Sequence, residues 1–140
     1  MKFSYLLLFN LLVTHLYSQE VISFKSSNPF GFRDVITNLE NLQDQEVEAI
    51  LKLPKGKGPF PLIIGVAGSL DWGPHHLEYL QMFRKSRIAT LELQSFSSRG
   101  VKSTVGSQVE VTTATMVLDA YRALDKISTH PDIDKDRVAI

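Results

Sequence analysis

Two loops in this 140-residue chain carry residue types that take part in chemistry, and each follows an apolar run. The first loop is "AGSLDWG", residues 67–73, and the second is "QSFSSRG", residues 94–100. If the apolar runs are strands of an open α/β sheet, both loops leave the carboxyl ends of strands, where ligands bind in such folds. We therefore expect the two loops to form one side of a cleft.

The loop "AGSLDWG" predicts a turn that presents backbone amides. Gly68 allows the chain to turn sharply as it leaves the strand, so that the next amide, that of Ser69, points into the cleft. A backbone amide in this position could stabilise the oxyanion that forms when a carbonyl group is attacked. A phosphate cradle is the second interpretation, but the glycine spacing matches neither a Walker loop nor a dinucleotide fingerprint. A plain turn at a strand end is the remaining alternative.

The second loop contains one cation of interest, Arg99. Its planar guanidinium could bind a carboxylate or another anionic group through two parallel hydrogen bonds. The alternative is a surface arginine, or one that only braces its own loop. The neighbouring hydroxyl residues, Ser95, Ser97 and Ser98, have no base beside them in the sequence, so we interpret them as loop-forming serines.

Composition excludes several kinds of site. The chain is 44% hydrophobic and 21% charged, which is typical of one globular domain. Lys+Arg and Asp+Glu both number 15, and this balance argues against a nucleic-acid partner or a basic membrane patch. There is no cysteine, so a disulfide, a thiolate zinc site and a cysteine nucleophile are excluded within these residues.

His75 and His76 are adjacent at a predicted helix start and cannot bind one metal ion together, so we expect no metal and no cofactor.

The elements that would position the two loops alternate along the chain. Apolar runs predict strands over residues 45–54, 61–68 and 88–96, and the continuous run in 61–68 is typical of a strand covered on both faces. Helical spacing predicts helices over residues 75–86 and 108–128. The apolar stripe expected on the second helix consists of Ala114, Val117, Leu118, Tyr121 and Leu124. Asp119 is expected on the solvated face of that helix.

A last buried strand is expected to begin at Arg137. Strands that alternate with helices through short connections predict right-handed crossovers and a parallel sheet, which is an α/β fold. The strand at the end of this chain would then lie in the same sheet as the two strands that carry the loops.

Residues 1–18 have the layout of a secretory signal peptide, with Lys2, an apolar core and the small residue Ser18 at the expected cleavage point. The apolar core is shorter than the ~20 residues of a membrane span. A buried N-terminal helix or an uncleaved anchor is the alternative. We expect an exported chain (periplasmic or secreted) with no stable membrane span, an extended lead-in over residues 19–45, and a folded domain over residues 46–140.

Residues 46–140 resemble the N-terminal half of an α/β-hydrolase of the dienelactone hydrolase family. The resemblance is carried by "PLIIGVAGS", "LELQSFSSRGV" and "MVLDAYRALDKISTHPDIDKDRVAI". It implies an α/β-hydrolase-like, mostly parallel sheet with flanking helices, of which this chain would hold an incomplete part. It also implies serine-type hydrolysis of a small-molecule carboxylic ester or related acyl substrate without a cofactor.

The resemblance assigns a role to two positions. The backbone amide of Ser69 matches the family's oxyanion position, and Arg99 resembles an arginine that binds the substrate carboxylate in diene-lactone-cleaving members. The family's nucleophile elbow, acid and histidine would all lie beyond Ile140, because no G-x-S-x-G frame occurs in this chain. Lactone-cleaving members have a glutamate where this chain has Gly68, which favours a serine nucleophile. A non-catalytic α/β-hydrolase-like binding protein is the alternative from another class.

Overall fold

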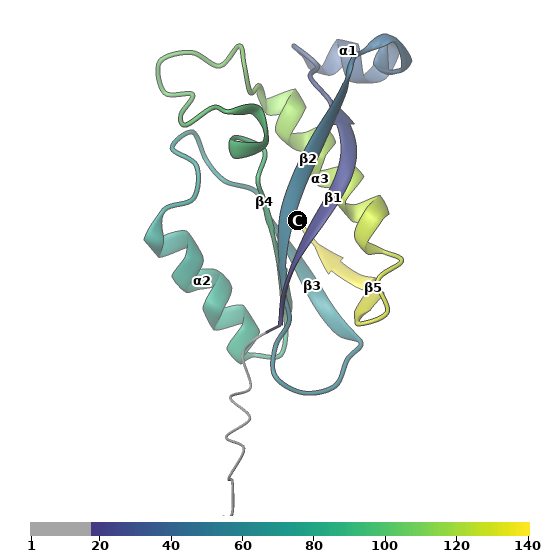
Figure 1. Cartoon of the computed structure of the whole chain (residues 1–140), viewed down its shortest axis with the longest axis vertical. Coiled ribbons are helices and arrows are strands. Elements are labelled where there is room, and N and C mark those ends of the chain that lie inside the picture. Colours follow the sequence, from purple (N-terminus) through teal and green to yellow (C-terminus); the bar gives the residue numbers. More distant parts are fainter. Residues whose placement is uncertain (1–17) are drawn as a thin grey trace, which may run out of the picture.

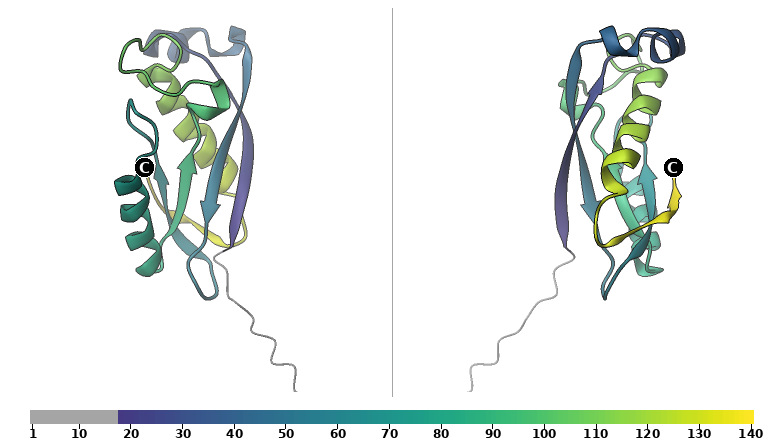
Figure 2. Two further views of the ribbon diagram at one scale, coloured as in Figure 1. Left: turned by 60° about the vertical axis from the view of Figure 1, so that its left-hand side comes forward. Right: turned by 90° about the vertical axis from the view of Figure 1, so that its right-hand side faces the viewer.

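The computed structural model describes residues 18–140, so the predicted signal peptide lies outside the described residues except for Ser18. A five-stranded sheet of order β1-β2-β4-β3-β5 crosses the molecule, and the two long helices, α2 and α3, lie on opposite faces of it (Figures 1 and 2). The elements in chain order are β1 (Gln19–Ser27), α1 (Phe32–Thr37), the 3₁₀ turn η1 (Leu39–Asn41), β2 (Asp44–Lys52), β3 (Phe60–Gly65), α2 (Pro74–Lys85), β4 (Ala89–Leu93), the 3₁₀ turn η2 (Ser97–Arg99), α3 (Thr113–Ile127) and β5 (Ile133–Ala139).

The strand–helix–strand alternation predicted from the sequence is confirmed. Strand β3 pairs in parallel with β4 on one side and with β5 on the other. Because the chain moves from β3 to β4 and then crosses back over β3 to β5, right-handed crossovers place α2 and α3 on opposite faces. Strands β1 and β2 are antiparallel, and β2 is antiparallel to β4, so the sheet as a whole is mixed.

The segment expected as an extended lead-in, 19–45, contributes β1 and the start of β2 to this same sheet, with α1 and η1 between them. Strand β1 pairs with β2 along nine residues, from Gln19 opposite Lys52 to Ser27 opposite Asp44. Ile22 and Phe24 of β1 are buried in the main core. The N-terminal hairpin therefore contributes to the hydrophobic core as well as extending the sheet.

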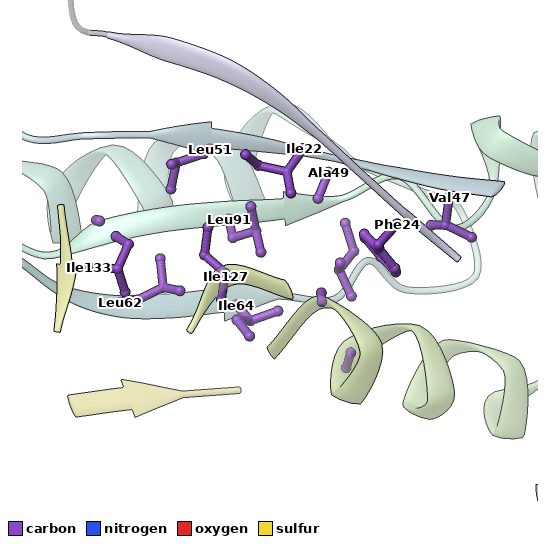
Figure 3. Close-up of a cluster of buried hydrophobic side chains, with 14 of the residues drawn as sticks. Ile22, Phe24, Val47, Ala49, Leu51, Leu62, Ile64, Leu91, Ile127 and Ile133 are labelled. Carbon is purple, nitrogen blue, oxygen red and sulfur yellow. The ribbon is translucent and has the colours of Figure 1, made fainter. Parts of the chain in front are cut away.

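The core lies between the sheet and α3 (Figure 3). Every second residue of the strands faces it, as expected of a strand with one face on a core. The buried residues of this cluster are Ile22, Phe24, Val47, Ala49, Leu51, Phe60, Leu62, Ile64, Ala89, Leu91, Leu93, Ala120, Ala123, Ile127 and Ile133. Strand β3 is fully buried only on this side, because Ile63 and Gly65 on its other face are half-buried.

Helix α3 differs from its prediction in where it starts and in which face it buries. It begins at Thr113, because Thr112 caps the helix by accepting a hydrogen bond from the amide of Thr115, and the β-branched residues before it stay outside. Two members of the expected stripe are exposed, Val117 at 38% and Tyr121 at 60%. The buried face instead consists of Ala114, Thr115, Leu118, Asp119, Ala120, Ala123 and Ile127. Small residues prevail there because the helix packs close against the sheet.

Helix α2 covers the other face through few apolar contacts. It begins with Pro74 at a position where the missing amide hydrogen is not needed, and it ends with Arg84 and Lys85 near its negative pole. Of the apolar residues expected to face the core, only Leu80 is buried, while Met82 is 59% exposed. Polar contacts occupy this face: the buried Glu92 of β4 pairs with Lys52 at 2.7 Å, between Nζ and Oε1.

Strand β5 starts earlier than predicted, at Ile133 rather than Arg137, and it is an edge strand. Most of its residues are exposed, so the expectation of a buried strand is wrong for the residues described. Charged residues are tolerated along it because, among residues 18–140, only one side of the strand is paired, with β3. Arg137 donates a hydrogen bond to Asp134 and holds the pKa of that exposed carboxyl below its usual range.

Candidate functional site

The two loops singled out in the sequence leave the same edge of the sheet. The first follows β3 and the second follows β4, and these neighbouring strands are parallel. A backbone hydrogen bond of 2.9 Å from Thr104 N to Ser69 O ties one loop to the other. Thr104 is buried, so this connection is shielded from water. The structure therefore brings the loops together, as the sequence predicts.

Ser69 lies on the exposed part of the first loop. Its carbonyl is engaged by Thr104, but its amide donates no hydrogen bond to any group among residues 18–140. An exposed, unpaired amide beside a fixed carbonyl is available to a ligand's oxygen atom. The geometry is compatible with an oxyanion donor, and the role of Ser69 stays a prediction.

The sharp turn depends on Asp71 rather than on Gly68. Asp71 has φ of 59°, in the left-handed region, and its amide donates to the carbonyl of Gly68 at 2.9 Å. Gly68 has no positive φ, and a Cβ added to it would meet nothing within 4 Å. The expectation that Gly68 supplies conformational freedom is therefore wrong. Its missing side chain leaves open space directly before the amide of Ser69.

Trp72 fixes the other end of this loop. Its indole Nε1 donates a 2.8 Å hydrogen bond to the carbonyl of Leu93, the last residue of β4. The far edge of the indole lies so close to Gly65 that a Cβ there would be 2.7 Å from Cη2 of Trp72. The glycine that matters for packing is therefore Gly65, inside β3. Sequence reasoning missed both residues, because their contact joins a strand to a loop seven positions later.

The loops border an open cleft of about 480 Å³. The first loop contributes Leu70, Asp71 and Trp72 to its lining, and the second contributes Ser97, Gly100, Val101 and Lys102. Leu70 is 74% exposed, so an apolar side chain stands at the edge of the opening. The lining combines apolar surface with the carboxylate of Asp71 and one exposed cation, which suits a small molecule that has both an apolar and a polar part.

Arg99 lies beside the cleft but does not line it. The guanidinium forms a two-pronged ion pair with Asp119, with Nη1 at 2.8 Å from Oδ2 and Nη2 at 3.0 Å from Oδ1. Only 4% of the arginine side chain is exposed, and none of the aspartate side chain. In this arrangement Arg99 braces its loop against α3. Binding of a substrate carboxylate by Arg99 stays a prediction, and it would require these bonds to open.

Asp119 is the main polar residue that sequence reasoning placed wrongly. It was expected on the solvated face of the second long helix, yet its side chain is fully buried and also accepts a hydrogen bond from the hydroxyl of Ser26. The available signal was its position four residues after Thr115, on a helix face of small residues. A carboxylate in such a stripe indicates that a cationic side chain is buried beside it, but the sequence does not say which residue that is.

The histidine pair begins α2, as expected. His76 accepts a hydrogen bond from the amide of Gly73 at 3.0 Å and so caps the helix. Its ring lies 3.8 Å from that of His75, centre to centre. Within residues 18–140 no cluster of three or more histidine, aspartate or glutamate side chains is arranged to hold a metal ion. In the same range no helix is long and apolar enough to cross a membrane.

Comparisons with known proteins give a match at the level of structure. No protein-family model matches the sequence, and no curated protein matches it significantly. A solved structure from Klebsiella pneumoniae, of a protein provisionally named a dienelactone hydrolase, matches with a TM-score of 0.55 and 15% sequence identity. The match covers 85% of this chain and 48% of that chain, so this chain spans about half the length of its structural neighbour.

Two further structures are less similar. A dienelactone hydrolase-like promiscuous phosphotriesterase from metagenomic libraries has a TM-score of 0.45 at 15% identity, over 84% of this chain and 47% of that one. A glucuronoyl esterase from Sporotrichum thermophile has a TM-score of 0.40 at 21% identity, over 69% and 28%. At identities this low, the likeness concerns the fold. The chain has an α/β-hydrolase-like fold that matches a dienelactone hydrolase-like structure over about half of that structure's length.

Proposed function

We propose that this chain is part of an exported hydrolase of carboxylic esters, in which the backbone amide of Ser69 is one donor of the oxyanion hole. The observation that carries the proposal is that Ser69 is an exposed residue at the carboxyl edge of the sheet and that its amide donates no hydrogen bond among residues 18–140. The structural likeness to a dienelactone hydrolase-like protein supports hydrolysis as the reaction class. The predicted signal peptide supports export.

The proposed chemistry is acyl transfer through a serine hydroxyl. The hydroxyl oxygen attacks the ester carbonyl carbon as its proton passes to the histidine, the carbonyl oxygen becomes an oxyanion, and the amide of Ser69 stabilises that charge. The bond to the alkoxy oxygen then breaks, and the alcohol leaves with a proton from the histidine. Water hydrolyses the acyl-enzyme in the same way. We place the nucleophile, acid and histidine outside residues 1–140, since the chain has no G-x-S-x-G frame.

The donor is a backbone group, and this gives a sharp test with a matched pair of variants. Ser69→Pro removes the amide hydrogen, whereas Ser69→Ala removes only the hydroxyl. In the polypeptide that includes the residues following Ile140, Ser69→Pro should lower kcat for p-nitrophenyl acetate by about 100- to 1,000-fold, which is the effect of losing one oxyanion donor. KM should change little, and Ser69→Ala should stay close to wild type.

Gly68→Val is a second variant that leaves the amide in place. Its side chain would enter the open space before Ser69, where a Cβ on residue 68 meets nothing within 4 Å. It should therefore lower kcat while thermal unfolding stays unchanged. If Ser69→Pro is folded and hydrolyses the ester as fast as Ser69→Ala, the oxyanion assignment is wrong. If the polypeptide after Ile140 has no hydroxyl or thiol at a strand-to-helix elbow, the non-catalytic binding protein becomes the better hypothesis.

A further inference from the structure

We infer that Arg99 is a positioning residue that holds one wall of the cleft, and that the cation available to a ligand's anionic group in this cleft is Lys102. The kinetic part of this inference rests on the proposed ester hydrolysis, whereas the role of Arg99 in holding the wall does not. The family resemblance implies the opposite assignment for Arg99, and arginine is the side chain best suited to bind a carboxylate with two bonds.

The hydrogen-bonding capacity of Arg99 is already filled by the protein. A guanidinium has five N–H donors, and here each has an acceptor. Nε donates to Asn28 Oδ1 at 2.6 Å. Nη1 donates to Ser95 O and to Asp119 Oδ2, both at 2.8 Å. Nη2 donates to Ser27 O at 3.2 Å and to Asp119 Oδ1 at 3.0 Å.

These acceptors come from three separate parts of the fold. Ser27 ends β1 and Asn28 follows it, Ser95 follows β4, and Asp119 is in the middle of α3. A single side chain therefore fixes the loop after β4 to the carboxyl end of β1 and to the core helix α3. A ligand carboxylate would have to displace the fully buried Asp119, which would leave that charge without its partner.

The segment that Arg99 anchors, residues 97–102, forms one wall of the cleft. Ser97, Gly100 and Val101 line the cleft immediately on either side of Arg99. Gly100 takes φ of 68°, which reverses the chain there, and Val101 N donates to Phe96 O at 3.0 Å. Arg99 points inward from this tight turn, and Ser98 bonds to the amide of Glu48 in β2, whereas Ser97, Gly100 and Val101 face the cleft. Weakening the hydrogen bonds of the Arg99 guanidinium should therefore move the whole wall together.

Lys102 lies on the cleft side of the same segment. It lines the cleft, its side chain is exposed, and it makes no hydrogen bond or ion pair with any other group among residues 18–140. No other lysine, arginine or histidine is in the lining. An anionic group on a bound ester would therefore meet the ammonium of Lys102 before any other cation of this cleft.

The kinetic test uses two esters that differ in one carboxylate, p-nitrophenyl butyrate and p-nitrophenyl hemisuccinate. Arg99→Lys and Asp119→Asn should each lower kcat/KM for both esters by about tenfold, because displacement of a wall misplaces either substrate. The ratio of the two kcat/KM values should stay the same. Lys102→Met should lower kcat/KM about threefold for the anionic ester alone, since an exposed charge contributes little.

A spectroscopic test does not depend on activity. Trp72 is the only tryptophan of the chain and lines the cleft opposite the wall. Arg99→Lys and Asp119→Asn should shift its fluorescence emission to longer wavelength and make it more accessible to acrylamide. Lys102→Met should not, and neither should Ile127→Val, which loosens the core at the far end of α3. Asn28→Ala removes one of the five acceptors of Arg99, the partner of Nε, together with an exposed hydrogen bond to Gln45, and should give a smaller shift in the same direction.

Two results would overturn the inference. One is an Arg99→Lys variant that loses activity on the hemisuccinate but not on the butyrate, while in Asp119→Asn the ratio of kcat/KM for the two esters stays at its wild-type value. The other is unchanged Trp72 emission and quenching in folded Arg99→Lys, Asp119→Asn and Asn28→Ala. Failure of the wild-type polypeptide to hydrolyse either ester would instead refute the proposed function, and the fluorescence result would still decide the role of Arg99.

Discussion

At the scale of the residue, Asp119 shows how a charge becomes compatible with a protein interior. Its side chain has no exposed surface, and it lies on a helix face made largely of alanines and one leucine. A lone carboxylate there would be strongly unfavourable, because burial removes its hydration. Two N–H donors from Arg99 and the hydroxyl of Ser26 replace the lost water. The charge is retained because its partners are complete.

Removing this carboxylate should be costly. We expect Asp119→Ala to lower the free energy of unfolding by about 3 kcal/mol, since it leaves the buried guanidinium of Arg99 without its anion. Asp125→Ala on the exposed side of the same helix is the matched control and should change stability by less than about 0.5 kcal/mol. Urea denaturation followed by circular dichroism measures both. Equal stability of the two variants would show that the ion pair contributes nothing.

At the scale of the element, the loop after β3 keeps its shape through contacts at each end and in the middle. The indole of Trp72 bonds to the end of β4, Thr104 holds the carbonyl of Ser69, and Asp71 closes the turn onto Gly68. A loop that is fixed at several points holds the unpaired amide of Ser69 in one position. Such preorganisation is what an oxyanion donor requires, because donors that must reorganise during the reaction stabilise the transition state less.

Two glycines of this region should respond differently to alanine. Gly65→Ala places a Cβ 2.7 Å from the indole of Trp72, so the ring must move and its bond to Leu93 must stretch or break. We expect a loss of about 1–3 kcal/mol of stability, as for other overpacked sites, with a change in tryptophan emission. Gly68→Ala has open space and should show neither effect. Thermal unfolding and tryptophan fluorescence of both variants check this prediction. If Gly65→Ala and Gly68→Ala give the same results, the indole of Trp72 moves aside at little cost in stability.

At the scale of the whole molecule, the two faces of the sheet are covered by different means. Helix α3 buries seven residues against an apolar core, whereas α2 buries only Leu80 among the described residues. Under α2 the sheet presents Thr90 and the buried Glu92, which bond to Arg84 and Lys52. Polar contacts of this kind add specificity more than net stability. The α2 side should therefore open more easily than the α3 side.

Hydrogen exchange tests this difference directly. Amides of α2 should exchange through local opening, at lower free energy than those of α3 and β4, because less apolar surface must be exposed to release α2. Exchange read peptide by peptide by mass spectrometry on the full-length protein separates the two helices. The central residues of β4 are the internal reference, since all five residues of that strand are buried. Protection of α2 equal to that of α3 would contradict this account.

Much of the fold could be predicted because its signals are local. Apolar runs and helical spacing located β2, β3, β4 and both long helices, and their alternation indicated the parallel part of the sheet. Helix capping explains why an observed helix boundary differs from the predicted one: Thr112 caps α3, so the helix begins at Thr113 and not at residue 108. The antiparallel pairing of β1 and β2 was not predicted, because residues 19–45 alternate weakly and the partners lie far apart in the chain, from Ser27 opposite Asp44 to Gln19 opposite Lys52.

The sequence by itself determined the composition of the candidate site: two loops after parallel strands, with Ser69 in one and Arg99 in the other. Only the tertiary structure decided what these residues do. The amide of Ser69 is left unpaired, whereas the guanidinium of Arg99 is satisfied by acceptors 4 to 72 positions away in the chain. A residue type fixes which bonds a side chain can form, but packing decides which partners reach it first and whether any capacity remains for a ligand.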